Sequence, residues 1–328
     1  MKQASYWEAR EEGKVRCRLC PHQCVISPDR EGICKNKRNV DGKLFAHRYG
    51  EISALALDPI EKKPLYHFHP GRMILSVGTI GCNLSCRFCQ NYHLVQGQVP
   101  TDPATPEEIV QAAIKQRSFG ISYTYNEPFI SFEFVLDTAK LAKEKGLSNV
   151  LVTNGYYNPE PFEELLPFID AMNIDLKSIR DGFYKNLCKA RVEPVKVTIA
   201  RAVKDCLVEV TNLLVTGEND SDEDLRDLVD WLAGVGPEIP LHFSAYRPMF
   251  KLNNPSTPLE RLNRAYEIAS QKMKWVYLGN VMMELGQDSN CPHCRARLVR
   301  RRGYSTKLEN LRGSECGKCG GAVNFVAE

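Results

Sequence analysis

The sequence lacks any apolar run long enough to cross a lipid bilayer. Its first residues are polar and of mixed charge, so we expect no signal peptide. Neither sign of charge dominates, and a net charge of +3 is too small by itself to indicate a nucleic acid or a membrane. These features predict a cytoplasmic protein without a membrane partner, and they make a nucleic-acid partner the less favoured expectation. With 328 residues, of which 43% are hydrophobic, the chain can bury a large core.

Cysteine is present in excess, with 13 residues. In a cytosolic chain, cysteines more often bind metals or act in catalysis than form disulfides. Cys188 and Cys206 stand alone, and we expect both to be buried free thiols. The others form three groups: Cys17, Cys20, Cys24 and Cys34; Cys82, Cys86 and Cys89; and Cys291, Cys294, Cys316 and Cys319.

The middle group is the one around which the rest of the chain is organised. Cys82, Cys86 and Cys89 have C-x3-C-x2-C spacing, which can bind three corners of a 4Fe–4S cube and leave the fourth iron open. Phe88 would give this loop an apolar cover. Residues 73–79 predict a buried parallel strand, so the loop follows the strand's carboxyl end, where α/β barrels build active sites. A zinc site or three unrelated thiols are the alternatives.

The first cysteine group lies in a short segment punctuated by proline and glycine. Cys17, Cys20 and Cys24 have C-x2-C-x3-C spacing, and Cys34 follows. The segment has few apolar residues, so we expect a metal to stabilise it. Zinc would take all four thiolates tetrahedrally. An auxiliary iron–sulfur cluster is the competing interpretation, and the sequence leaves both open.

The last cysteine group predicts a zinc ribbon at the end of the chain. Cys291 and Cys294 form one C-x2-C pair, and Cys316 and Cys319 form a second. Paired spacings of this kind bind a structural zinc ion. A single iron, as in rubredoxin, is the alternative. This tail is basic, which could serve binding of RNA or an acidic partner, but a solvated basic face is the commoner outcome.

Between residues 73 and 281, apolar strands alternate with helical patterns, which predicts a parallel sheet with right-handed crossovers. About six βα units fit, so we expect an α/β fold with a partial, TIM-like barrel. The predicted domains are a Cys-rich segment and arm (1–70), the barrel (71–282) and the ribbon (283–328). The predicted strands are 73–79, 120–125, 149–153, 169–177, 207–215 and 241–246, and the predicted helices are 106–116 with Thr105 as N-cap, 131–144, 159–166, 222–233 and 258–272.

Polar residues occupy alternate positions toward the carboxyl ends of several of these strands. This alternation places each set on one face of the sheet. Their convergence at one end of a barrel predicts a ligand pocket. A solvated barrel mouth, or a salt bridge between Asp175 and Lys177, is the alternative. The sets are Ser122, Thr124 and Asn126; Asn173, Asp175 and Lys177; and His242, Ser244 and Tyr246, with Asn154 ending a further strand.

The triplet with an aromatic residue before its last cysteine resembles the radical S-adenosylmethionine (SAM) superfamily. In that family the open iron binds the amino and carboxylate groups of SAM, and one electron splits SAM into methionine and a 5′-deoxyadenosyl radical. Residues 124–128 (TYNEP) stand where many members carry a Gly-Gly-Glu motif. The resemblance implies that Glu127 receives the SAM amino group, with Tyr125 and Asn126 in place of the glycines.

Two more motifs resemble the activating enzymes of glycyl radical enzymes. Residues 153–155 resemble their TNG turn, and residues 175–177 resemble their DLK motif. The resemblance implies that Lys177 faces the SAM carboxylate and that Asp175 contacts SAM or substrate. The expected SAM contacts are Phe88, Tyr125, Asn126, Glu127, Asn154, Asp175, Lys177 and His242.

The whole layout is similar to the AmmeMemoRadiSam system radical SAM enzymes, through the CRLCPHQC segment, the arm at residues 58–68, the core and the paired-cysteine tail. This resemblance implies an oxidoreductase that takes an electron from a donor such as flavodoxin or ferredoxin. It also implies Memo and AMMECR homologues, or a substrate protein, as partners. The substrate is open: a protein glycine, as for pyruvate formate-lyase activation, or another carbon. A radical SAM enzyme acting on RNA and a metal-bound, non-enzymatic scaffold are the alternative functions.

Overall fold

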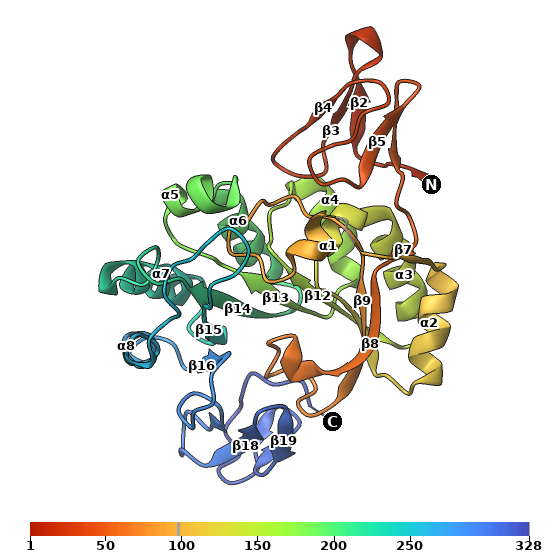
Figure 1. The fold of residues 1–328 in the computed structure, drawn as a ribbon. Coiled ribbons are helices and arrows are strands. Elements are labelled where there is room, and N and C mark those ends of the chain that lie inside the picture. Colours follow the sequence, from red (N-terminus) through yellow and green to blue (C-terminus); the bar gives the residue numbers. More distant parts are fainter. Residues whose placement is uncertain (97–98, 328) are drawn as a thin grey trace.

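The computed structural model describes residues 1–96 and 99–327, and one eight-stranded sheet forms its centre (Figure 1). The strand order is β16-β15-β14-β13-β12-β11-β9-β8, which leaves β16 and β8 at the edges. The pairs from β9 to β16 are parallel, and β8 is antiparallel to β9. The strands of this sheet are β8 (Ala54–Pro59), β9 (Met73–Gly78), β11 (Gly120–Tyr123), β12 (Ser148–Thr153), β13 (Ala171–Asp175), β14 (Leu207–Leu214), β15 (Leu241–Ala245) and β16 (Val276–Gly279).

Helices connect the parallel strands and pack against them, as α2 does on β9 and β11, α3 on β11 and β12, and α8 on β15 and β16. No helix among the described residues is long and apolar enough to cross a membrane. The helices are α1 (Tyr92–Gln96), α2 (Pro106–Lys115), α3 (Phe132–Glu144), α4 (Pro159–Leu165), α5 (Asp181–Phe183), α6 (Glu193–Ala202), α7 (Asp222–Val235) and α8 (Leu259–Ala269), with a π-helical turn at Tyr184–Cys188.

The predicted strands and helices of this region are present, with ends shifted by a few residues. The N-cap of α2 is confirmed: the Thr105 hydroxyl accepts a hydrogen bond from Glu108 N, and the Glu108 carboxylate accepts one from Thr105 N. The sequence analysis missed β16 and α6. With only four residues, β16 is too short to show the alternating pattern of a strand.

The arm at residues 58–68 packs on one face of the sheet, near the amino ends of its strands. Ile60, Leu65 and Phe68 form a buried cluster with sheet residues that include Val150 and Ala171. The Asn173 amide donates to Pro64 O over 2.8 Å. The arm therefore covers sheet residues near the amino ends of the strands.

The two small appendages lie at opposite ends of the sheet (Figure 1). The tail packs on the arm: Val326 N donates to His67 O, and His69 N donates to Val326 O. The N-terminal segment lies beyond the carboxyl ends, close to the residues that follow β9. The remaining strands are β1 (Lys2–Gln3), β2 (Trp7–Ala9), β3 (Val15–Cys17), β4 (Val25–Ile26), β5 (Lys37–Val40), β6 (Lys43–Ala46), β7 (Glu51–Ile52), β10 (Asp102–Pro103), β17 (Ser289–Asn290), β18 (Arg297–Arg302), β19 (Ser305–Leu308), β20 (Leu311–Arg312) and β21 (Glu315–Cys316).

His67 links the arm, the sheet and the tail. Its Nδ1 lies 2.5 Å from Asn324 O, its Nε2 lies 2.7 Å from the Tyr277 hydroxyl, and its backbone N–H donates to Glu209 over 2.7 Å. Its ring stacks on Phe325. Burial lowers the pKa of His67 to about 4, so the ring is neutral at pH 7. A neutral ring that donates to Asn324 O accepts from Tyr277, which satisfies both nitrogens.

This depressed pKa makes part of the folding stability depend on pH. The unfolded chain protonates His67 near pH 6.5 and the folded chain only near pH 4, so stability is lost as the pH falls through this window. His67→Gln has no titrating ring. We expect the stability advantage of the wild-type protein over this variant to shrink by about 2 kcal/mol between pH 7.5 and pH 5. Denaturant titrations at both pH values measure it, and an advantage that stays constant contradicts the assignment.

Candidate functional site

The cysteine triplet lies on the loop that leaves β9, at the carboxyl end of the sheet. Gly81, directly before Cys82, has a φ of +94°. A Cβ at Gly81 would stand 2.1 Å from the backbone oxygen of Cys34. Both the positive φ and this contact require glycine, so the loop and the N-terminal segment are fitted to each other at this point.

The triplet sulfurs do not form the compact group that a single ion needs. Across residues 1–96 and 99–327, the tail cysteines are the set whose ligand atoms all lie within 4.8 Å of one another. Cys82, Cys86 and Cys89 do not form such a group, which suits a cluster, in which each thiolate binds a different iron. Burial raises the pKa of Cys82 well above its usual value and that of Cys89 to about 11. The thiolates therefore need cationic metal beside them, and the site fits an iron–sulfur cluster.

Two asparagines hold the triplet loop in place. Asn126 accepts from Thr79 N at 3.0 Å, and its amide donates to Thr79 Oγ1 at 2.9 Å and Gly81 O at 3.0 Å. Asn154 donates to the Asn83 side chain over 2.8 Å, and its Nδ2 lies 3.6 Å from Cys82 Sγ. Both side chains were expected to contact SAM, which stays a prediction, and the structure shows that their amides also bond the loop.

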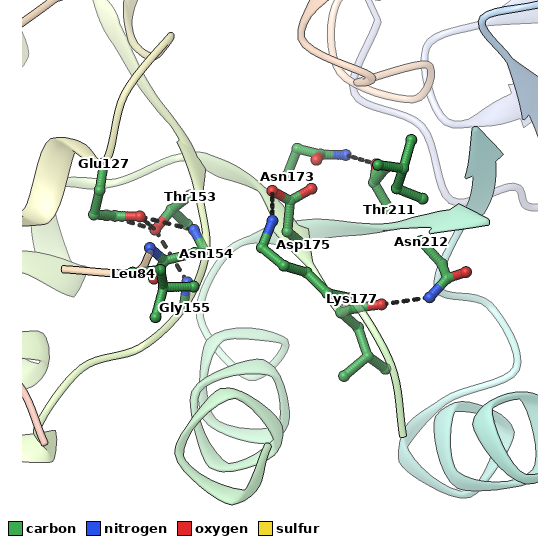
Figure 2. A network of polar contacts seen from close by, with 12 residues as sticks. Leu84, Glu127, Thr153, Asn154, Gly155, Asn173, Asp175, Lys177, Thr211 and Asn212 are labelled. Carbon is green, nitrogen blue, oxygen red and sulfur yellow. Dashed lines mark hydrogen bonds and ion pairs between the residues drawn. The ribbon is translucent and has the colours of Figure 1, made fainter. Parts of the chain in front are cut away.

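Glu127 accepts hydrogen bonds from the chain's own groups (Figure 2). Its carboxylate accepts from Thr153 Oγ1 at 2.8 Å, Asn154 N at 2.8 Å and Phe129 N at 3.0 Å. Burial raises the pKa of Glu127 to about 7, although these hydrogen bonds favour the charged form. A carboxylate has about four acceptor sites, so these three donors leave room for another, and the expectation that Glu127 receives an amino group stays a prediction. In the structure the carboxylate also fixes the turn that carries Asn154.

Asp175 and Lys177 form an ion pair of 2.7 Å at the end of β13, apart from the Glu127 group in Figure 2. The Lys177 Nζ stands 6.0 Å from the centre of the buried Phe88 ring, which places the pair beside the triplet loop. Asn219 donates to Lys177 O over 2.6 Å and fixes the backbone there. Asp175 remains partly exposed, so the pair lines an accessible surface.

Tyr125 contacts the arm, and His242 contacts both the sheet and the arm. The Tyr125 hydroxyl donates to Asp58, and its φ of +73° is one that glycine would adopt without strain. His242 Nε2 is 2.6 Å from Glu209 Oε2, and its buried ring packs edge-on against Tyr66. Glu209 and the arm therefore hold the His242 side chain, and its expected contact with SAM stays a prediction.

Cys188 is a residue that the sequence analysis did not connect with the site. Its thiol lies beside Cys86 and lowers the pKa of Cys86. The backbone supports the contact, since Ser85 N donates to Cys188 O over 2.9 Å and Arg87 N donates to Leu187 O over 2.9 Å. No spacing in the sequence signals this contact, because the π-helical turn that carries Cys188 reaches the loop only through the fold.

The tail cysteines form a second kind of site. The Sγ atoms of Cys291 and Cys319 are 3.8 Å apart, and those of Cys294 and Cys316 are 3.7 Å apart. Four thiolates about 2.3 Å from one tetrahedral ion lie about 3.8 Å from each other. The geometry is that of a single metal ion.

Comparisons with known proteins agree with this arrangement. The model of the radical SAM superfamily matches residues 76–232. An uncharacterized protein of Methanocaldococcus jannaschii is 43% identical over 335 residues, covering 99% of this chain and 100% of that protein. A putative glycyl-radical enzyme activating enzyme of the same organism is 30% identical over 169 residues (49% and 68%). A pyruvate formate-lyase-activating enzyme of Clostridium pasteurianum is 25% identical over 166 residues (47% and 67%).

The chain therefore belongs to the radical SAM superfamily, and it is similar to activating enzymes of glycyl radical enzymes. Membership implies a 4Fe–4S cluster and SAM, and the catalytic relatives support an enzyme.

Asn126 offers a test of how the loop is held. Asn126→Ala removes the hydrogen bonds to Thr79 and Gly81, and we expect it to cost about 1–3 kcal/mol of stability and to release most of the iron bound at the triplet. Asn149→Ala is the control: Asn149 is the more deeply buried of the two, and its amide donates to Ala139 O and Phe168 O, away from the loop. Iron content after anaerobic gel filtration and unfolding titrations measure both effects. Equal iron retention by the two variants contradicts this role.

Proposed function

We propose that this protein cleaves SAM reductively at a 4Fe–4S cluster and uses the resulting 5′-deoxyadenosyl radical to abstract a hydrogen atom from a substrate. The observation that carries this proposal is the triplet loop at the carboxyl end of β9, held by Asn126 and Asn154 beside the Asp175–Lys177 pair.

Cys82, Cys86 and Cys89 would hold the cluster, which supplies one electron for SAM cleavage when it is bound. Lys177 would face the SAM carboxylate, and Asp175 would face its ammonium group. The two residues pair with each other in the structure. The zwitterionic end of SAM could replace that contact with two new ion pairs, without leaving a charge unpaired.

The other residues of the site would orient these groups. Glu127 fixes the turn at Thr153 and Asn154, and Asn154 in turn fixes Asn83 inside the triplet loop. Phe88 is buried next to Phe183, so it would exclude water from that side of the loop. With these groups held by the fold, little reorganisation is needed when SAM binds.

The similarity to activating enzymes favours a glycine of a partner protein as the hydrogen donor. The resemblance to the AmmeMemoRadiSam subgroup adds Memo and AMMECR homologues as proposed partners. We further propose a cytoplasmic oxidoreductase reduced by a flavodoxin- or ferredoxin-like protein. Its proposed domains are a Cys-rich segment and arm (1–70), a partial barrel (71–282) and a ribbon (283–328).

The tail offers no observation that favours RNA as the substrate. Arg297 pairs with Glu309 and Asp288, Arg302 pairs with Asp288, and Arg301 is buried. Much of its positive charge is therefore compensated within the tail. The tail also packs on the arm, at the opposite end of the sheet from the triplet loop.

We propose that the tail holds one structural zinc ion at Cys291, Cys294, Cys316 and Cys319. The double variant Cys294→Ser/Cys319→Ser should lose about one zinc ion per chain, because two of four ligands no longer bind. Cys206→Ala is the control and should retain the ion, since Cys206 belongs to none of the three cysteine groups. Metal analysis by mass spectrometry measures this. A red protein with iron in place of zinc contradicts the choice of metal, and an unchanged metal content contradicts the site.

The proposed activity is tested by release of 5′-deoxyadenosine from SAM. The protein is reconstituted with iron and sulfide without oxygen and reduced with dithionite. We expect release by the wild-type protein and by Cys206→Ala, and none by Cys82→Ala/Cys86→Ala/Cys89→Ala. Absence of release from wild-type protein that holds zinc at the triplet would favour the scaffold interpretation.

The same assay tests the role of Lys177. Lys177→Ala should raise the SAM concentration needed for half-maximal release at least tenfold, since an ion pair to the SAM carboxylate is lost and about 1.4 kcal/mol corresponds to each factor of ten. Lys196→Ala, on the surface of α6, is the control. An unchanged SAM dependence in Lys177→Ala contradicts this assignment while leaving the activity itself in place.

A further inference from the structure

The four cysteines of the N-terminal segment line one hollow. Cys17 ends β3 and Cys24 precedes β4, and Cys17 N donates to Cys24 O over 2.9 Å across this hairpin. Cys20 lies in the hairpin turn, and Cys34 comes from the loop before β5. All four line the hollow together with Leu19, Ile26, Phe129 and Ile130. The fold therefore places four thiols around one hollow that apolar side chains also line.

The N-terminal thiols differ from the tail thiols in that they do not form a compact group suited to one ion. The tail sulfurs lie within 4.8 Å of one another, as one tetrahedral ion requires. Among the residues that the structure describes, the tail cysteines are the group found close enough together for one ion, and Cys17, Cys20, Cys24 and Cys34 do not form such a group. Cys82, Cys86 and Cys89, where the family implies a cluster, do not form one either. The N-terminal set therefore resembles the triplet, in which each thiolate binds a different iron, more than it resembles the tail.

The hollow also adjoins the triplet loop. Asn83, the residue after Cys82, lines it, and His22 Nε2 lies 2.8 Å from Asn83 O. On the other side, the backbone oxygen of Cys34 presses against Gly81, directly before Cys82. The N-terminal segment and the triplet loop, which lie far apart in the sequence, therefore pack directly against each other. Each of them carries cysteines next to this contact.

We propose that Cys17, Cys20, Cys24 and Cys34 hold a second 4Fe–4S cluster, adjacent to the cluster of the triplet loop. All four irons would carry a cysteine ligand from this chain, so this cluster has no open iron and does not bind SAM. Its chemistry is limited to exchanging single electrons and to ordering the N-terminal segment. The proposal concerns a binding site for iron and sulfide, and it does not depend on the activity proposed above.

The variant Cys82→Ala/Cys86→Ala/Cys89→Ala tests this proposal, because it leaves the N-terminal set intact. The full-length chain is reconstituted with iron and sulfide without oxygen and then analysed for iron, zinc and acid-labile sulfide. We expect this variant to retain about half of the wild-type sulfide, close to four per chain. Cys206→Ala should retain all of it. A triple variant without sulfide, whether or not it holds a second zinc ion, overturns the proposal.

A second measurement covers the case in which the triple variant does not fold. The reduced wild-type protein is examined by electron paramagnetic resonance with and without SAM. We expect two cluster signals, of which SAM changes one and leaves the other unchanged, because only one cluster has an open iron. A single signal that responds entirely to SAM overturns the proposal. Failure of the proposed activity is recognised separately, by the absence of 5′-deoxyadenosine in protein that contains both clusters.

Discussion

The contact between Gly81 and the backbone oxygen of Cys34 is the constraint on which the arrangement of this end of the molecule depends. Because a Cβ would stand 2.1 Å from that oxygen, no other residue fits at position 81 without moving one of the two segments. The contact fixes the start of the triplet loop against the N-terminal segment. Asn126 then holds the same loop from the opposite side, through Thr79 and Gly81. These contacts fix the start of the loop that carries Cys82.

The two ends of the sheet's inner face have different tasks. At the amino ends of the strands, the arm and the tail close the face through buried polar contacts, with Arg301 donating to Tyr66 O over 2.7 Å and Glu209 accepting from His67 and His242. Such buried groups are costly unless every partner is in place, so they bind the tail to the arm in one arrangement. At the carboxyl ends, Asp175 stays partly exposed and free to exchange partners.

The sequence predicted most of the fold but only part of the site. Strands and helices were readable from periodicity because each buries one face, and the triplet was readable because its spacing reflects the shape of a metal cluster. The contacts of Asn126 and Asn154 with the triplet loop were not readable. Both residues were expected to face a ligand, which stays a prediction, and the structure adds that their amides bond the loop. Sequence spacing gives the face on which a side chain stands, but not which of several neighbouring acceptors it reaches.

The sequence by itself determined the superfamily, the order of the elements and the three cysteine groups, because these depend on local spacing and period. Only the tertiary structure decided that Cys188 contacts Cys86, that Glu209 holds His242, and that the tail packs away from the site. It also showed that the tail thiols form a compact group suited to one ion and that the other two sets do not, a distinction that depends on distances between residues apart in the chain. Such distances are set by packing of the whole molecule, which no local pattern encodes.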